Sequence, residues 1–214
     1  LDERSRIADL GCGTGGQTMT LAEACPAQIT AIDNYPGFID KLNHEVQAKG
    51  LQARVNGLVG TMEEPPFEPG SLDLIWCEGA IYNIGFERGI RLWYPLLKEG
   101  GYLALTESCW LTEERPKEIH AFWMEGYPEI GTILVKQEQL KQAGYQLVST
   151  FVLPESCWTD NYYQPIATWK ETFRAKHPGN RSVEELLRFL ELETNMYRRY
   201  QAYYGYVFFI AKKC

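Results

Sequence analysis

The residues best suited to chemistry lie in one short, glycine-rich loop. Residues 7–16 read Ile-Ala-Asp-Leu-Gly-Cys-Gly-Thr-Gly-Gly, an apolar strand that runs directly into glycines. A loop that lacks β-carbons can turn sharply, let its backbone approach a ligand and direct peptide N–H groups at an anion. The pattern therefore predicts a loop that holds a small-molecule cofactor.

Carboxylates follow two later apolar runs of the chain. Asp33 ends the run 29–32, where a carboxylate can accept hydrogen bonds from both hydroxyls of a ribose. Glu78 follows the run 71–77 and could accept a substrate proton, bind a substrate cation or stabilise a positive charge. We expect Tyr82 to line the same pocket, and Glu107 is a weaker second acid.

Strands and helices alternate along the chain, and this order must position those residues. Such alternation predicts a mostly parallel sheet that is covered by helices on both faces and binds its ligands at the carboxyl ends of the strands. The expected helices cover residues 17–24, 38–49, 86–97, 137–143 and 182–200, and the expected strands cover 7–10, 29–32, 54–59, 71–77, 102–106 and 146–153. Ser182 and Glu185 form a capping-box pattern at the start of the last helix.

Asp9 distinguishes between two classes of cofactor that the glycine spacing alone cannot tell apart. The spacing of Gly11, Gly13 and Gly16 also fits G-x-G-x-x-G, which is shared by dinucleotide and S-adenosylmethionine (SAM) sites. The nicotinamide fingerprint usually has an apolar residue where this chain has Asp9. Residues 9–15, Asp-Leu-Gly-Cys-Gly-Thr-Gly, instead resemble motif I of the class I SAM-dependent methyltransferases.

Later segments resemble further motifs of that family, in the family's order. They are 29–33, 60–62, 71–77 and 96–103, and the resemblance covers residues 5–153 well and 203–213 moderately. Within the superfamily the chain is most similar to the small-molecule enzymes of the methyltransferase 11 or 25 kind. The resemblance implies a Rossmann-like, doubly wound, seven-stranded sheet, mostly parallel, with an antiparallel last strand at 206–211.

The resemblance also implies SAM as methyl donor and S-adenosylhomocysteine as product. Thr61 stands where many relatives carry an acidic residue, which leaves the backbone N–H of Met62 to face the adenine. The implied cofactor-binding residues are Asp9, Gly11, Cys12, Gly13, Thr14, Gly15, Gln17, Thr18, Asp33, Asn34, Gly60, Thr61, Met62 and Glu78.

Residues 154–203 exceed what the minimal fold needs. We expect one methyltransferase domain over 1–214, with this segment inserted before the last strand as a substrate lid over the reactive end of the cofactor. Its first half, 157–165, is rich in aromatic residues with polar tips, including Trp158 and Tyr163. The candidate catalytic residues are Glu78, Tyr82 and Tyr163.

Composition restricts the remaining possibilities. The net charge is −7 and the basic residues are scattered, which argues against nucleic acid as a partner. The six cysteines have neither metal-ligand nor disulfide spacing, and no apolar run is long enough for a membrane span, so we expect a cytoplasmic protein without a metal. Because the chain begins at Leu1 without an initiator Met, we expect it to be a fragment.

Two other functions stay open alongside a methyltransferase that acts on a small molecule. One is a Rossmann-type NAD-dependent oxidoreductase, which Asp9 and the later motifs disfavour. The other is a protein of the same fold that binds SAM without transferring a methyl group. The sequence does not identify the methyl acceptor or the oligomeric state.

Overall fold

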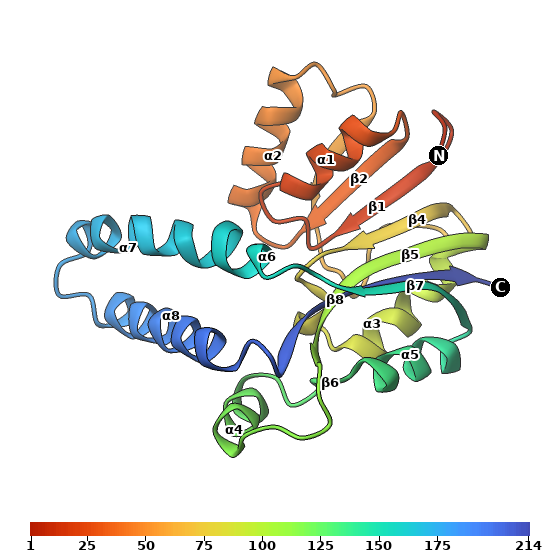
Figure 1. Cartoon of the computed structure of the whole chain (residues 1–214). Helices are drawn as coiled ribbons and strands as arrows, with labels where there is room; N and C mark the ends of the chain where they lie inside the picture. Colours follow the sequence, from red (N-terminus) through yellow and green to blue (C-terminus); the bar gives the residue numbers. More distant parts are fainter. The chain divides into compact units, whose positions relative to one another are not determined.

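A central sheet organises the computed structural model, which describes all residues from 1 to 214 (Figure 1). Its strand order is β3-β2-β1-β4-β5-β8-β7, and a short strand, β6, pairs with β5 outside this path. The strands are β1 (Arg6–Leu10), β2 (Gln28–Asp33), β3 (Val55–Val59), β4 (Leu72–Cys77), β5 (Leu97–Trp110), β6 (Gly131–Thr132), β7 (Tyr145–Val152) and β8 (Tyr204–Lys213).

The sheet confirms the expected Rossmann-like topology. β1 pairs in parallel with β2 on one side and with β4 on the other, and β2–β3 and β4–β5 are also parallel. Figure 1 shows β8 running opposite to its neighbours β5 and β7, as expected for the last strand. The chain order reverses direction at β1 and β4, and ligands of such sheets bind beyond the carboxyl ends of the strands at that point.

The chain divides into two compact units. Unit 1 comprises residues 1–107, 133–151 and 207–214, and unit 2 comprises 108–132 and 152–206. The predicted lid segment, 154–203, falls entirely in unit 2, which also contains residues 108–132.

Unit 1 packs its helices through apolar stripes. The helices are α1 (Gly16–Ala24), α2 (Pro36–Ala48), the short 3-10 turns η1 (Ile81–Asn83) and η2 (Tyr94–Leu96), α3 (Phe86–Trp93) and α5 (Ile133–Gln142). In α2 the buried residues Ile39, Leu42 and Val46 recur at helical spacing and face β2 and β3. In α3, Phe86 and Trp93 are fully buried. Burial of each such side chain contributes about 1.5–3 kcal/mol.

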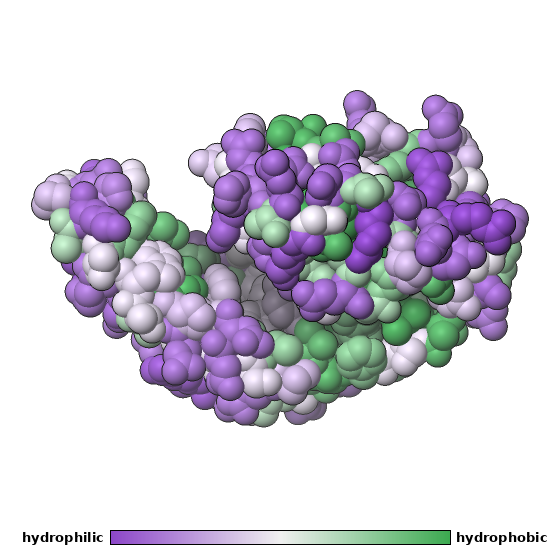
Figure 2. Space-filling view, turned by 90° about the horizontal axis from the view of Figure 1, so that it is seen from above, coloured by the Kyte–Doolittle hydropathy of each residue, from purple (hydrophilic) through white to green (hydrophobic).

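Unit 2 is built from helices around a cluster of aromatic residues. Its helices are α4 (Lys117–Gly126), α6 (Ser156–Trp158), the π-helical turn η3 (Thr159–Tyr163), α7 (Gln164–Lys176) and α8 (Arg181–Tyr200). The buried core consists of Trp110, Ile119, Ile130, Trp158, Tyr163, Tyr197, Tyr200 and Tyr204. Hydrophilic residues gather at the end of α7, at the left of Figure 2, where Lys176 and His177 are exposed.

Two local predictions were wrong. The α-helix expected over 86–97 ends at Trp93 and continues only as the 3-10 turn 94–96, because Pro95 has no backbone N–H to donate to the carbonyl four residues earlier. Ser182 does not cap α8. The cap is Asn180, whose Oδ1 accepts hydrogen bonds from the backbone N–H groups of Ser182 and Val183 at 3.1 and 3.3 Å.

Candidate cofactor and active site

The glycine loop connects the end of β1 to the start of α1. Gly11 has φ +74°, and a β-carbon there would lie 2.3 Å from Cβ of Ala80, so another side chain at position 11 is excluded sterically. Gly13 has φ +54°, and a β-carbon there would meet no atom within 4 Å. The loop is therefore packed against the protein at Gly11 and bordered by open space at Gly13, which is the side available to a ligand.

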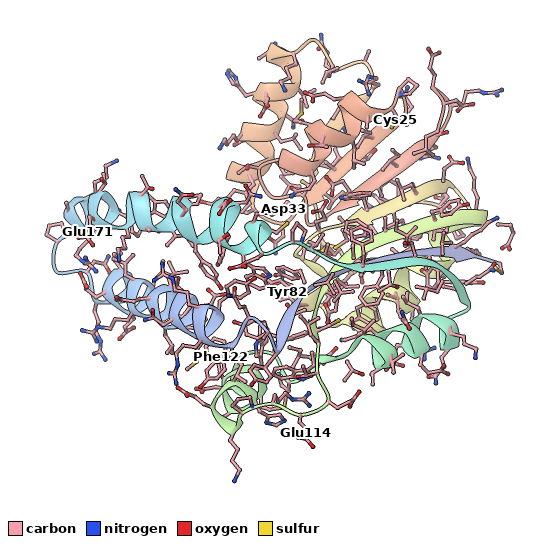
Figure 3. The ribbon with its side chains drawn as sticks, viewed as in Figure 1. Cys25, Asp33, Tyr82, Glu114, Phe122 and Glu171 are labelled. Carbon is pink, nitrogen blue, oxygen red and sulfur yellow. The ribbon has the colours of Figure 1, made fainter.

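Asp33 joins this loop to the end of β2, where Figure 3 labels it. The N–H of Gly13 donates to Oδ2 of Asp33 at 2.9 Å, and the N–H of Tyr35 donates to Oδ1 at 3.0 Å. The N–H groups of Gly11 and Cys12 both donate to the carbonyl oxygen of Ile32, at 2.8 and 3.0 Å. Each carboxylate oxygen has a second lone pair, so the partly exposed Asp33 can still accept a ligand hydroxyl.

Asp9 and Thr18 lie beneath the loop. Asp9 is 2 % exposed, and Oγ1 of Thr18 donates to its Oδ2 at 2.6 Å. Burial, together with the charges of Glu78 and Asp33, raises the pKa of Asp9 to about 7 against the opposing effect of the Thr18 hydrogen bond. Burial also raises the pKa of the Cys12 thiol, so Cys12 stays a neutral thiol.

The segment after β3 is fixed to the same region. The N–H of Gly60 donates to the carbonyl oxygen of Asp33 at 3.0 Å. The backbone oxygen of Met62 accepts a hydrogen bond from Nε1 of the buried Trp93 at 2.8 Å. A β-carbon on Gly11 would lie 2.9 Å from Sδ of Met62, so this methionine borders the glycine loop. Oγ1 of Thr61 accepts from the N–H of Glu64 at 3.3 Å.

Glu78 follows β4, and hydrogen bonds orient both its side chain and its loop. Nε1 of Trp76 donates to Oε1 of Glu78 at 2.9 Å. The N–H of Gly79 donates to Oγ1 of Thr106 on β5 at 2.8 Å, which fixes the loop behind the carboxylate. Burial raises the pKa of Glu78, while hydrogen bonds from Trp76 and Gln17 oppose that rise.

Several predicted site residues therefore meet at the carboxyl ends of β1, β2 and β4. The contacts of Glu78 with Gln17, and the effect of its charge on Asp9, place it beside the glycine loop. Tyr82 is exposed in η1 (Figure 3). Gly15 borders Leu42 of α2, Thr14 is partly exposed, and Asn34 is exposed beyond β2.

Sequence reasoning missed the residues that support this site. Trp76 carried a usable signal: it precedes Glu78 by two positions, and Glu78 directly follows β4, so continuing the alternation of the strand by one residue puts both side chains on one face. Thr106 and Trp93 carried no such signal, since their hydrogen-bond partners, Gly79 and Met62, lie 27 and 31 residues away along the chain.

Tyr163, the third candidate catalytic residue, belongs to unit 2 and is 6 % exposed. Its ring lies 6.0 Å from that of Trp158 and 5.5 Å from that of Tyr197. Burial and the charge of Glu193 raise the pKa of its hydroxyl, so Tyr163 is neutral near neutral pH.

Metal and membrane features are absent from the structure. It contains no group of three or more His, Cys, Asp or Glu side chains that could hold a metal ion. All six cysteines are free thiols. None of the helices has the length and apolar character that crossing a membrane requires.

Comparisons with known proteins agree with this geometry. Residues 7–101 match the family described as "Methyltransferase domain". The sterol 24-C-methyltransferase of Candida albicans is 25 % identical over 156 residues, which are 69 % of this chain and 41 % of that protein. The chain spans between about two fifths and one half of the length of the sterol methyltransferases it matches.

Solved structures share the fold over the whole chain. A SAM-dependent methyltransferase from Geobacter sulfurreducens in complex with S-adenosylhomocysteine has a TM-score of 0.85 at 19 % identity, covering 100 % of this chain and 86 % of that one. The cyclase SpnF has a TM-score of 0.81 at 21 % identity, covering 100 % of this chain and 76 % of that one. At such identities the likeness shows a common fold.

Proposed function

We propose that this chain, which belongs to the SAM-dependent methyltransferase family, transfers a methyl group from SAM to a small-molecule acceptor. The observation that carries the proposal is the glycine loop bound to Asp33, with open space beside Gly13. The match of residues 7–101 to the methyltransferase domain supports it, because that match covers the loop, Asp33 and Glu78.

The residues present fit the cofactor. Asp33 would accept hydrogen bonds from the ribose hydroxyls, the loop backbone around Gly13 would face the amino-acid portion, and the segment at Met62 would border the adenine. SAM supplies an electrophilic methyl group on a sulfonium. The protein's task is then to orient an acceptor atom about 3 Å from that methyl carbon and to exclude water.

Glu78 is the side chain that we propose to assist the acceptor. Its carboxylate is half buried beside the loop, and Trp76 and the Thr106–Gly79 hydrogen bond fix its orientation. A carboxylate with a raised pKa is a better proton acceptor at neutral pH than an ordinary glutamate, so we propose that Glu78 takes a proton from the acceptor. Tyr82 would line the acceptor's approach.

Titration calorimetry tests the cofactor assignment. The chain should bind SAM and S-adenosylhomocysteine and show little affinity for NAD. Asp33→Ala should weaken binding about tenfold or more, because it removes charge-assisted hydrogen bonds worth roughly 1.5–3 kcal/mol. Asp40→Ala, at an exposed position on α2, is the matched control and should leave the affinity unchanged. Tight binding of NAD without binding of SAM would favour the oxidoreductase instead.

Turnover tests the role of Glu78. Glu78→Gln keeps the size of the side chain and removes its charge, so turnover should fall by roughly 10²–10⁴-fold while SAM affinity is retained. Glu68→Gln, at an exposed position without a resolved interaction, serves as the control. Full activity of Glu78→Gln at every pH would make the carboxylate structural.

The finer features of the function stay proposals. We propose that 1–214 is one methyltransferase domain whose segment 154–203 selects the acceptor, that the protein is cytoplasmic and that it does not bind nucleic acid. If the segment acts as a lid, Trp158→Ala or Tyr163→Ala should impair turnover while SAM affinity changes only a few-fold.

The similarity to the cyclase SpnF favours one second candidate function, that of a protein of this fold that does not transfer a methyl group. Measuring turnover of SAM separates the two.

A further inference from the structure

Unit 2 contains a half-buried carboxylate, Glu193 of α8, that faces tyrosine side chains. The hydroxyl of Tyr162 donates to Oε2 of Glu193 at 3.5 Å, the long limit of a hydrogen bond. The ring of Tyr163 lies 5.1 Å from that of Tyr162 and 5.5 Å from that of Tyr197. Burial is the main cause of the raised pKa values of Tyr163 and Tyr204, and the negative charge of Glu193 raises both further.

Two deeply buried polar groups of this cluster lack a partner. Tyr163 is 6 % exposed and its hydroxyl makes no hydrogen bond. Trp158, which is 5 % exposed and stacks on Tyr163, makes none through Nε1. Buried polar groups are nearly always paired in folded proteins, and an unpaired one is costly. The indole N–H of Trp158 can only donate, whereas the Tyr163 hydroxyl can also accept, so the unpaired phenol near Glu193 is the group that could receive a hydrogen bond from a ligand.

The chemistry of the cluster selects the kind of ligand. A carboxylate in a desolvated position repels anions and gains most from a positive partner. Aromatic rings attract cations through their faces, and phenol oxygens can accept hydrogen bonds from N–H groups. A metal ion is disfavoured, because the structure has no group of several acidic, histidine or cysteine ligands. An organic cation matches a single carboxylate that contacts the hydroxyl of Tyr162 and acts electrostatically on the phenols of Tyr163 and Tyr204.

We propose that Glu193, Tyr162, Tyr163 and Tyr204 form a binding site for an organic ammonium ion. Glu193 supplies the counter-charge, and the free hydroxyl of Tyr163 accepts a hydrogen bond from the ammonium N–H. All four residues belong to unit 2, and the inference does not depend on the proposed function.

Calorimetric titration of the full chain with two probes of the same shape tests the site. Protonated N,N-dimethylethanolamine carries a positive N–H where its neutral counterpart, 3-methylbutan-1-ol, carries C–H. We expect saturable binding of the amine and binding of the alcohol that is weaker by about tenfold or more, as loss of a charge-assisted contact predicts. Glu193→Gln should weaken amine binding by a similar factor, and Tyr163→Phe by a smaller one.

Glu191→Gln is the matched control, because Glu191 is an exposed glutamate on the same helix. It should bind the amine as the wild type does, and equal melting temperatures of the two glutamine variants would show that both are folded. Equal affinity for amine and alcohol, unchanged amine binding in Glu193→Gln, or no saturable binding of the amine would each overturn the proposal.

A parallel titration with SAM separates this inference from the proposed function. SAM binding without amine binding would remove the ammonium site and leave the methyltransferase proposal intact. Amine binding without SAM binding would do the reverse.

Discussion

Replacing Asp9 by Asn should remove a pH dependence from the stability of the fold. In the folded chain burial raises the pKa of Asp9 to about 7, whereas in the unfolded chain the pKa returns to its ordinary value of 3.8. Between these values the folded chain holds a proton that the unfolded chain has released. The free energy of unfolding must therefore fall as the pH rises through this window, and it becomes independent of this group above about pH 7.

The magnitude follows from the same two pKa values. Each pH unit inside the window costs about 1.4 kcal/mol, so the full effect is about 4 kcal/mol and the portion between about pH 5 and pH 8 is ~3 kcal/mol. Asp9→Asn cannot titrate, and its amide oxygen can still accept the Thr18 hydrogen bond. We therefore expect the variant to gain about 3 kcal/mol relative to the wild type as the pH rises over that interval.

Urea unfolding of both proteins at the two pH values measures this difference, in which the other titrating groups cancel. Asp73→Asn is the control. Hydrogen bonds from Lys98 and from the backbone of Arg6 outweigh burial and hold the pKa of Asp73 below its usual value, so this variant should keep the wild-type pH dependence. Parallel pH profiles of the wild type and Asp9→Asn would refute the reasoning.

Two further predictions concern buried polar contacts. Lys136→Met should destabilise the fold by roughly 3–5 kcal/mol, because it leaves Glu107 buried and 1 % exposed without the ammonium that now lies 2.7 Å from its Oε1. The double variant with Glu107→Gln should recover much of that loss in thermal unfolding, and a double variant no more stable than the single one would contradict this account. Asn180→Ala should cost about 1 kcal/mol through loss of the α8 cap, whereas Ser182→Ala should cost almost nothing in the same assay. Equal losses of stability in the two variants would indicate that Ser182 also caps α8.

Local sequence patterns determined much of the architecture. The glycines at 11 and 13 identified the loop, because glycine has no β-carbon and adopts left-handed φ values without strain. Both residues have such values in the structure. Alternating apolar runs located the main strands to within a few residues, since a buried parallel strand needs apolar side chains on both faces. The position of Asp33 at the end of its apolar run was sufficient to predict that it lies near the loop, because neighbouring parallel strands end at the same edge of a sheet.

Boundaries were less predictable where several local signals competed. Asn180 and Ser182 are both good capping residues, and the sequence pattern favoured the wrong one. The extra turn at 94–96 depends on Pro95 and on the start of β5 directly after it. The alternative caps and helix ends differ by small free energies, so tertiary packing decides between them.

Only the tertiary structure decided which distant residues became partners. Thr106 holds the loop of Glu78, Lys136 pairs with Glu107, and Glu193 accepts a hydrogen bond from Tyr162. No sequence periodicity predicts these pairs, because each pair joins separate elements whose relative position is fixed by burial of apolar surface. The sequence by itself determined the fold class and the cofactor loop, while long-range packing determined which carboxylates are buried, and hence their pKa values and their partners.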